Sequence, residues 1–335
     1  MHRRRRNGEL VRETTRVWPK YKLTCFCYND LKAATERFSV RNFIGEGGMG
    51  KVYKGWIDNH TMAPSKRGTG LAVAVKELRK ENFWGHDEWQ NELKFLSRFN
   101  HPNVVKLIGY CSEGDNRILV YEYMRKGSLE AHLNRESKRE LDWKRRIRIA
   151  VGAARGLAYL HGASRPVIHR DLKASNILLD IDYTPKISDF GLAKFAPDCG
   201  KSHITTRILG TKGYFAPEYV ATGHLTLKCD VYGFGVVLLQ LFSGSPVIKK
   251  YSDGIAGDLA QWAKPYLCSR VEIQHVIDKK LATEYPVEDA YEFASIIGQC
   301  LDLNPRSRPT MREVVSALEK LDQHINSSSH NSITV

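Results

Sequence analysis

The sequence of 335 residues lacks any hydrophobic stretch long enough to cross a lipid bilayer. Its longest apolar run, GVVLLQLF at residues 235–242, is far shorter than the roughly 20 residues that a membrane-spanning helix needs. The N-terminus reads MHRRRRNGEL and has no apolar segment of the kind that a signal peptide contains. We therefore expect a cytosolic protein unless something tethers the chain.

Cysteine pairs with the spacing of a zinc site are missing as well. The seven cysteines are odd in number, scattered, and never spaced as CxxC, so the sequence indicates neither a zinc site nor a disulfide framework. A reducing compartment fits this usage best. The sequence also has no internal repeat. The cysteines are Cys25, Cys27, Cys111, Cys199, Cys229, Cys268 and Cys300.

A motif for binding nucleic acid is absent too, although the formal net charge is +14. The sequence contains no zinc-finger, helix-turn-helix or RNP-type pattern. Residues 1–22 hold eight Lys or Arg against Glu9 and Glu13, a net charge of +6 in one basic tail. Such a tail suits an anionic membrane face at least as well as DNA. The alternative is a solvated tail without a partner, and we expect no nucleic-acid partner.

The composition, 42% hydrophobic and 26% charged, is that of a soluble globular protein with room for two core-bearing lobes. From Phe38 the sequence is strand-like, with a hairpin around GEGGMG and a strand LAVAVKEL at 71–78. A helix is predicted over residues 87–99, where apolar residues recur on one face, and two more strands over 104–111 and 117–124. These elements predict a small β-rich lobe with one main helix.

The pattern after Gly127 is helical. It predicts a long core helix over residues 143–162 and a helix over 231–242 that is apolar all round and therefore buried. Two amphipathic helices follow, and the polar, serine-rich end at 325–335 is expected to be disordered. The overall prediction is a two-lobed α+β fold. Its parts are a basic tail and lead-in segment (1–37), an N-lobe (38–124), a mainly helical C-lobe (125–322) and a polar C-terminal tail (323–335).

The glycine-rich stretch GEGGMG at 45–50 has two interpretations, a flexible hairpin turn or a dinucleotide fingerprint. A dinucleotide fingerprint must open a helix, whereas here the residues that follow, KVY, continue as a strand. The glycines therefore cap a hairpin whose bare backbone N–H groups can approach phosphate oxygens. Val52, two residues further on, could then lie against a purine.

Lys76 follows four apolar residues in AVAVKEL and should begin close to the core, where it needs a counter-charge. Glu92 is the favoured partner because it lies beside the apolar stripe of the predicted helix at 87–99. Glu88, one turn earlier, is the alternative. A Lys–Glu pair whose Lys also touches phosphates is the ion pair of an active kinase.

Polar residues interrupt two apolar runs in VIHRDLKASNILLD at 167–180. In this loop Asp171 can accept a proton from a substrate hydroxyl, Lys173 can neutralise a transferred phosphoryl group, and Asn176 can ligate a metal ion. Asp189, in ISDFGLAK, would be the other metal ligand. Either stretch alone could be a chance turn. The sequence contains, in this order and at sensible separations, GEGGMGKV, AVAVK, HRDLKASN, DFG and APE. Chance occurrence of the whole set is negligible.

With these motifs the sequence resembles a eukaryotic protein kinase over about residues 38–322. The resemblance implies ATP as cosubstrate, with Mg²⁺ as the metal ion and Mn²⁺ as a substitute. It also implies that Glu218 pairs with Arg308 to brace the activation segment and that Asp230 anchors the catalytic loop. Tyr121 would be the gatekeeper, with the backbone of Glu122 and Met124 facing adenine. The full set of implied nucleotide contacts is Ile44, Gly45, Glu46, Gly47, Gly48, Gly50, Val52, Ala74, Lys76, Tyr121, Glu122, Met124 and Leu178.

Lys173, together with Thr211 in GTKGY, looks like the serine/threonine pattern and unlike that of tyrosine kinases. Stretches such as FCYNDLKAATERF, HPNVVKLIGYC and KSHITTRILGTKGY are similar to plant receptor-like cytoplasmic kinases of subfamily VII. That resemblance implies a relay of signals from cell-surface immune receptors, with an upstream receptor kinase and protein substrates as partners. Two departures from the family pattern are Gly233 and Gln240, where the family has Ser and Glu.

Regulation is expected in the activation segment. Arg170, before the catalytic Asp171, and Lys194 would place positive charge beneath this segment. A phosphate on Ser202, Thr205 or Thr206 could pair with both and order the loop. We favour Thr205 and Thr206, which are closest in sequence to Thr211 in the substrate-facing GTKGY.

The N-terminus sets the expected location of the protein. Members of the family usually start Met-Gly for myristoylation, whereas this chain starts Met-His, so we do not expect that attachment. Cys25 and Cys27 are candidates for palmitoylation, but the favoured interpretation is that these two cysteines, beside Phe26, are packed at an edge of the N-lobe, because Cys is so often buried. We expect a mainly cytosolic protein with a peripheral plasma-membrane fraction held by the basic tail.

Overall fold

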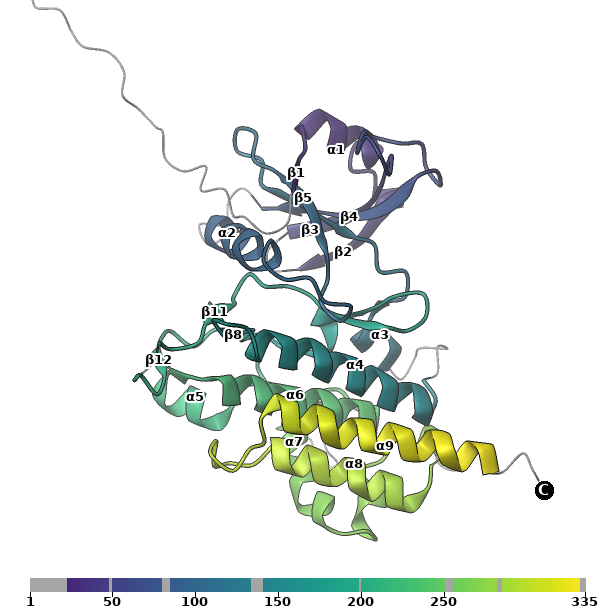
Figure 1. Cartoon of the computed structure of the whole chain (residues 1–335), viewed down its shortest axis with the longest axis vertical. Helices are drawn as coiled ribbons and strands as arrows, with labels where there is room; N and C mark the ends of the chain where they lie inside the picture. The colour runs from purple at the N-terminus through teal and green to yellow at the C-terminus, as the bar shows by residue number, and fades with distance from the viewer. Residues whose placement is uncertain are drawn as a thin grey trace, which may run out of the picture.

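The computed structural model describes residues 23–47, 50–79, 85–133, 141–198, 200–250, 256–281 and 285–331. Figure 1 shows a sheet-containing lobe beside a larger helical lobe, as the sequence predicts. The sheet of the small lobe has the strand order β1-β5-β6-β4-β3-β2, with β1 parallel to β5 and the other neighbours antiparallel. These strands are β1 (Thr24–Cys25), β2 (Phe43–Gly47), β3 (Gly50–Ile57), β4 (Leu71–Leu78), β5 (Leu107–Cys111) and β6 (Ile118–Glu122).

Alternation along β4 separates the two faces of this sheet. Val73 and Val75 are fully buried in an apolar cluster on the outer face, together with Phe26 and Leu31. Ala74 and Lys76 therefore project from the opposite face, the side on which α2 (Gly85–Leu96) supplies Glu92. The remaining helical elements of this lobe are α1 (Tyr28–Ala34) and η1 (Val40–Asn42), a 3₁₀ turn.

The large lobe is built around α6, whose residues from Cys229 to Ser243 are all buried. Figure 1 shows α9 running beside α4, and these two helices pack on one another. The helices of this lobe are α3 (Leu129–Leu133), α4 (Trp143–His161), α5 (Pro217–Thr222), α6 (Leu227–Ser243), α7 (Leu259–Ala263), α8 (Val287–Cys300) and α9 (Met311–Asn331), with 3₁₀ turns η2 (Ala174–Asn176), η3 (Lys264–Cys268), η4 (Glu272–His275) and η5 (Lys279–Leu281).

Short strand pairs hold the loops of the large lobe. A three-stranded sheet has the order β10-β9-β7, and the other strands form the pairs β8–β11, β12–β13 and β14–β15. The strands are β7 (Gly127–Ser128), β8 (Val167–Ile168), β9 (Ile177–Leu179), β10 (Pro185–Ile187), β11 (Lys194–Phe195), β12 (Ile204–Thr205), β13 (His224–Leu225), β14 (Ile248–Lys250) and β15 (Ala256–Asp258). None of the helices in the described ranges is long and apolar enough to cross a membrane.

The expected disorder of residues 325–335 is wrong for residues 325–331, because α9 continues to Asn331. Ile325 follows Leu321 by one helical turn and is 7% exposed, so it extends the buried face of α9. Asn326 accepts a hydrogen bond from Arg148 on α4 over 3.4 Å. Residues 332–335 lie outside the described ranges.

The lead-in segment ahead of residue 38 is also more structured than the sequence shows. Strand β1 pairs with β5, and Phe26 is 4% exposed, so Phe26 is packed at this edge of the small lobe. The expectation that Cys25 and Cys27 are packed there too is wrong, because both are exposed: alternate residues of an extended chain point to opposite faces. The basic tail, residues 1–22, lies outside the described ranges.

Candidate active site

The glycine-rich hairpin consists of β2 and β3, and Gly47 faces Gly50 in its register. A register shift between Phe43 and Gly45 marks a bulge at the base of the hairpin. Glu46 forms an ion pair with Arg79, which follows β4, so this side chain is held at the surface of the sheet. Gly48 lies outside the described residues. The glycine-rich stretch therefore joins two strands of a hairpin and does not open a helix, as the sequence predicted.

Lys76 lies between two carboxylates. Its Nζ is 2.7 Å from Oε1 of Glu92 and 3.6 Å from Oδ1 of Asp189. Burial works to lower the pKa of Lys76, but the charges of Asp189 and Glu92 outweigh it, so the pKa is raised and the amine stays protonated. The pairing with Glu92 is the predicted one, and the charge of Glu88, the alternative, affects the pKa of Lys76 less than the charges of Asp189 and Glu92 do.

Glu92 has a second partner that the sequence analysis missed. The hydroxyl of Tyr121 donates to Oε2 of Glu92 over 2.6 Å, while Oε1 is occupied by Lys76. Glu92 is 1% exposed, so both oxygens of a buried carboxylate are satisfied. Burial and the charge of Glu92 raise the pKa of Tyr121 well above its usual value. The signal was present in the buried strand ILVYE, since a buried tyrosine hydroxyl needs a partner.

The catalytic loop forms a closed polar triangle. Asp171 accepts a hydrogen bond over 2.7 Å from the hydroxyl of Thr211 and lies 2.8 Å from Nζ of Lys173. Lys173 in turn donates to Thr211 over 2.7 Å. The side chain of Asn176 donates to the backbone oxygen of Asp171 over 2.8 Å. Three residues that the sequence placed together are therefore in contact, and Thr211 joins them.

Asp230 anchors this loop from α6, as the resemblance implied. Its Oδ1 accepts from the backbone N–H of Arg170 over 2.8 Å, and its Oδ2 accepts from that of His169 over 2.7 Å. His161 Nε2 lies 3.0 Å from Oδ2. Asp230 is 2% exposed, and these contacts hold Arg170 at a φ of 73°, a left-handed conformation that side chains other than glycine rarely adopt.

Asp189 and Asn176 fit a hard divalent cation. Oδ1 of Asp189 is buried and makes no hydrogen bond within the described part of the chain. Asn176 uses its amide nitrogen toward Asp171, which leaves its oxygen as the ligand atom. No group of three His, Cys, Asp or Glu side chains in the described ranges forms a dedicated metal cage. A cation here would share its coordination with phosphates, as magnesium commonly does.

The side chains around the expected nucleotide site are placed as follows. Ala74 is opposite Tyr121 in the register of β4 and β6. The carboxylate of Glu122 contacts Lys186 at 2.9 Å and accepts from the backbone N–H of Lys106 over 2.7 Å. Its backbone N–H donates to the backbone oxygen of Lys106 over 3.1 Å, so a backbone contact of Glu122 with adenine would have to come from its carbonyl oxygen. Met124 is 6% exposed and directly precedes the turn into the large lobe.

The other predicted nucleotide contacts lie on strands. Leu178 is on β9, the central strand of its sheet, and Ile44 and Val52 are on the glycine-rich hairpin.

Arg170 reaches the activation segment. Its guanidinium donates to the hydroxyl of Tyr219 over 3.0 Å, to the hydroxyl of Thr206 over 3.2 Å and to the backbone oxygen of Arg207. The structure thus brings Thr206 to Arg170. Thr205 instead lies in β12, paired with His224, and Ser202 contacts the ring of His203. Lys194 lies in β11, which pairs with β8 just before the catalytic loop.

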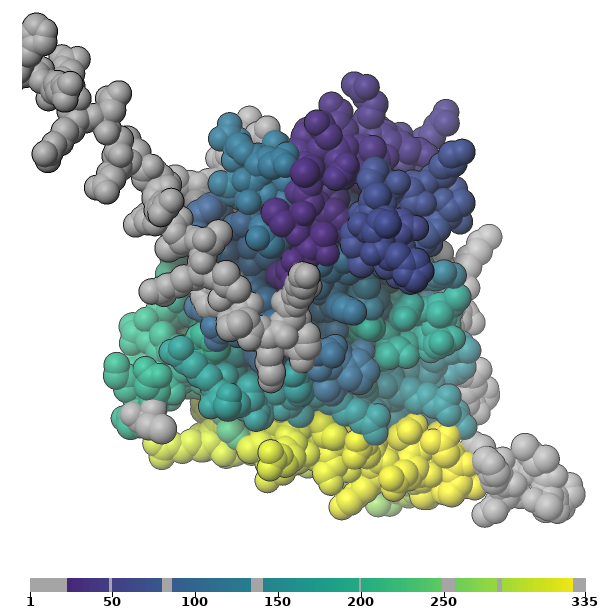
Figure 2. Space-filling model, turned by 45° about the horizontal axis from the view of Figure 1, so that its top comes forward, coloured from purple at the N-terminus to yellow at the C-terminus, as the bar shows by residue number. Residues whose placement is uncertain are grey.

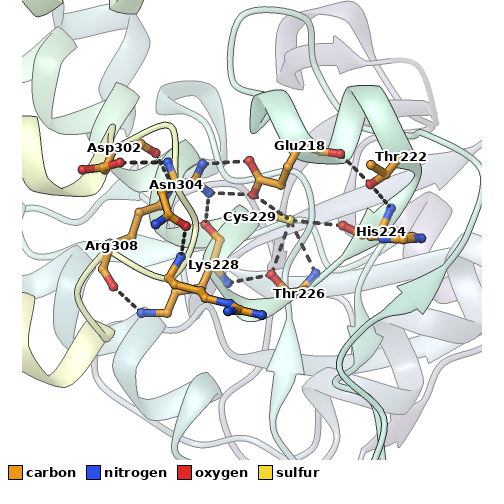
Figure 3. A network of polar contacts seen from close by, with 10 residues as sticks. Glu218, Thr222, His224, Thr226, Lys228, Cys229, Asp302, Asn304 and Arg308 are labelled. Atoms are coloured by element: carbon orange, nitrogen blue, oxygen red, sulfur yellow. Dashed lines mark hydrogen bonds and ion pairs between the residues drawn. The ribbon is translucent and has the colours of Figure 1, made fainter.

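Glu218 and Arg308 form the predicted brace, shown in Figure 3. Both terminal nitrogens of Arg308 donate to the two oxygens of Glu218, each over 2.7 Å, and its Nε donates to the backbone oxygen of Asp302 over 2.7 Å. Arg308 is 1% exposed. The thiol of Cys229 is 3.8 Å from Glu218, and burial raises its pKa to about 11, so it stays uncharged beside the carboxylate.

Comparison with known proteins agrees with this geometry. The protein kinase domain family matches residues 38–318. The chain is 51% identical over 318 residues to the probable serine/threonine-protein kinase PBL18 of Arabidopsis thaliana, covering 95% of this chain and 80% of that protein. It is 49% identical over 302 residues to the serine/threonine-protein kinase BIK1 of Arabidopsis thaliana (90% and 76%). It is 49% identical over 298 residues to receptor-like cytoplasmic kinase 176 of Oryza sativa subsp. japonica (88% and 75%). The chain therefore belongs to the protein kinase domain family, as a serine/threonine kinase.

Proposed function

We propose that this kinase transfers the γ-phosphoryl group of ATP to serine or threonine hydroxyls of protein substrates, with Mg²⁺ as metal ion and Mn²⁺ as a substitute. One observation carries the proposal. The charged groups needed for the transfer form two sets, Lys76 with Glu92 and Asp189, and Asp171 with Lys173, with contacts of 2.7 to 3.6 Å within the sets. Asn176 links the two sets, because it donates to Asp171 over 2.8 Å and accepts over 2.9 Å from the backbone N–H of the residue before Asp189. Phosphoryl transfer depends on such positioning and on charge stabilisation.

Each residue has a separate role in this proposal. Lys76 binds the α- and β-phosphates and is kept protonated by Glu92 and Asp189. Asp171 accepts the proton of the substrate hydroxyl, and Lys173, 2.8 Å away, offsets the charge of the transferred group. Asp189 and Asn176 hold the metal ion, which when bound neutralises charge on the phosphate oxygens.

The test is incubation of the full chain with ATP, Mg²⁺ and a generic basic protein, followed by mass spectrometry of the products. The control is Asp189→Asn, which removes one metal ligand and keeps the volume of the side chain. We expect phosphoserine or phosphothreonine with the parent chain and none with the variant, at equal thermal stability. Equal transfer by both proteins would contradict the proposed role of Asp189, and transfer by neither would contradict the activity.

We also propose that phosphorylation of the activation segment regulates the activity. The buried guanidinium of Arg170 has only neutral acceptors in the contacts recorded for it: Tyr219, Thr206 and the backbone of Arg207. A phosphate on Thr206 or Thr205 would provide a charged acceptor, with Lys194 as a second cation, and charge-assisted hydrogen bonds are the stronger kind. The contact with Thr206 supports that residue most directly.

The pathway we propose is a relay below plant cell-surface receptors, in immune signalling, with a receptor kinase upstream. The support is the similarity to a rice protein named receptor-like cytoplasmic kinase 176. The protein would act in the cytoplasm, with a fraction on the plasma membrane through its basic tail. Comparison of phosphopeptides from tissue with and without the kinase tests this proposal, and no change after receptor stimulation would contradict it.

A further inference from the structure

Residues 24–38, here called the docked segment, form a layer on the small lobe. The match to the protein kinase domain family begins at residue 38, so all but the last residue of the segment precede it. Figure 2 shows this purple N-terminal part lying against blue parts of the small lobe that follow it in the sequence. Phe26, Leu31 and Ala34 are 4%, 0% and 1% exposed, and they share an apolar cluster with the outer face of the sheet. The segment is thus a part of the folded lobe.

The sheet is shaped to receive the docked segment. A Cβ at Gly109 in β5 would lie 2.2 Å from the backbone oxygen of Thr24 and 2.6 Å from the ring of Phe26. A Cβ at Gly55 in β3 would lie 3.3 Å from the backbone oxygen of Ala34. Both glycines make room for backbone or ring atoms that come from the segment. This complementarity indicates a specific docked position.

The end of the segment is held in an unusual conformation. Glu36, Arg37 and Phe38 have φ angles of 52°, 63° and 54°, a left-handed run that is unfavourable for residues with a Cβ. Thr35 stabilises it, because its hydroxyl accepts from the backbone N–H of Phe38 over 3.1 Å and donates to the backbone oxygen of Leu31 over 2.7 Å. The turn therefore fixes where the ring of Phe38 is placed.

That ring links α1 to the glycine-rich hairpin. Its centroid is 5.9 Å from that of Tyr28 in α1 and 5.4 Å from that of Tyr53 in β3. Tyr53 is in turn 5.9 Å from Phe43, its partner in the register of β2 and β3. Neighbouring residues in a strand face opposite sides, so the outward contact of Tyr53 sets the inward position of Val52.

We propose that the docked segment positions the glycine-rich hairpin through Phe38 and thereby sets the affinity for nucleotide. The proposal rests on the proposed function, in which this hairpin covers ATP. Phe38 is a positioning residue here, since it acts through Tyr53 and Phe43 and touches neither nucleotide nor substrate.

The first test replaces the ring. Phe38→Ala removes it, Phe38→Tyr keeps it, and Val40→Ala is the matched control, because Val40 lies in the same connection and is 88% exposed. We expect Phe38→Ala to raise the Kd for Mg-ADP and the KM for ATP roughly two- to tenfold, the range of an aromatic pair contact. The kcat at saturating ATP should not change, and the other two variants should match the parent chain.

The second readout needs no nucleotide. Amide hydrogen exchange should become faster in Phe43–Gly47 and Gly50–Ile57 of Phe38→Ala, with no change in the exchange of α6. Gly109→Ala perturbs the same docking from the sheet side, and its effect should not add to that of Phe38→Ala, since both break one coupling.

Unchanged exchange in the hairpin of Phe38→Ala would overturn the proposal, as would equal losses of kcat and nucleotide affinity. A different result is that the parent chain binds no Mg-ADP, although Phe38→Ala still speeds up exchange in the hairpin. That result would contradict the proposed function and the effect on nucleotide affinity, and would support only the coupling of Phe38 to the hairpin. The two failures are therefore distinguishable.

Discussion

Replacing Tyr121 by phenylalanine tests the contact that completes the environment of Glu92. The change removes one oxygen and keeps the ring, so packing around this 8% exposed side chain is preserved. What is lost is the 2.6 Å hydrogen bond to Oε2 of Glu92. A hydrogen bond to a charged partner contributes about 1.5–3 kcal/mol, and the buried carboxylate oxygen would have no water to replace it. We expect the free energy of unfolding to fall by about that amount.

The same loss should reach catalysis, because Glu92 positions Lys76 at 2.7 Å. A carboxylate with one unsatisfied oxygen can rotate toward a new donor and weaken this ion pair. If about 1.4 kcal/mol of the lost interaction is expressed in the active arrangement, kcat/KM for ATP falls about tenfold. Urea unfolding followed by tryptophan fluorescence gives the stability, and initial rates against ATP concentration give the kinetic change.

The control is Tyr123→Phe, which removes a hydroxyl two residues away and keeps the ring beneath Lys54, 4.2 Å from its centroid. We expect it to unfold at the same urea concentration as the parent chain. If Tyr121→Phe also matched the parent in both stability and kcat/KM, the hydrogen bond to Glu92 would contribute nothing and this reasoning would be refuted. A matching loss in both variants would show that the effect is not specific to Glu92.

The remaining predictions concern other parts of the chain. Lys76→Met should abolish autophosphorylation while the circular dichroism spectrum stays unchanged, because in the proposed function this lysine binds the phosphates; wild-type turnover would contradict that role. Gly233→Ala should raise the free energy of unfolding by about 0.5–1 kcal/mol, because a Cβ there would lie 3.4 Å or more from its neighbours. Gly235→Ala should lower the free energy of unfolding, because a Cβ there would lie 2.8 Å from Cys300. Calorimetry measures both changes, and the opposite order would refute the packing argument. Changing Thr205 and Thr206 together to Ala should lower activity substantially, and full activity with no phosphate in the segment would exclude regulation there. Replacing all four arginines from Arg3 to Arg6 by Gln should reduce flotation with phosphatidylserine liposomes at low salt, because each Arg contributes about 1 kcal/mol to the binding free energy. Binding that depends neither on salt nor on these residues would show that the attachment is not electrostatic.

The sequence predicted those parts of the site where few residue types can perform the chemistry. Lys76, Asp171 and Asp189 stand in short motifs with fixed spacing, and strands such as LAVAVKEL have apolar patterns that local physics determines. Pairing of Lys76 with Glu92 followed from one helix face. The hydrogen bond from Tyr121 to Glu92 joins residues 29 apart, and no local pattern encodes which buried carboxylate a buried hydroxyl will meet.

The docked segment shows the same limit from another side. Phe26 and Leu31 are ordinary apolar residues in a short stretch, and the docking of this stretch depends on two distant glycines: Gly109 makes room for Phe26, and Gly55 makes room for the backbone oxygen of Ala34. The end of α9 is similar, since Ile325 is isolated among polar residues and gains its burial only from the rest of the large lobe. Composition alone favoured disorder there, and tertiary contact decided otherwise.

Gln240, one of the two departures from the family pattern, makes a buried polar contact. It is 3% exposed in α6, and its side-chain oxygen accepts a hydrogen bond from the hydroxyl of Tyr214 over 2.6 Å. The glutamate of the family pattern could accept the same hydrogen bond but would add a buried negative charge, which is costly without a cationic partner. The amide keeps the acceptor and avoids that cost. The contact from Tyr214 to α6, close to the catalytic loop, is therefore made in this chain with a neutral side chain.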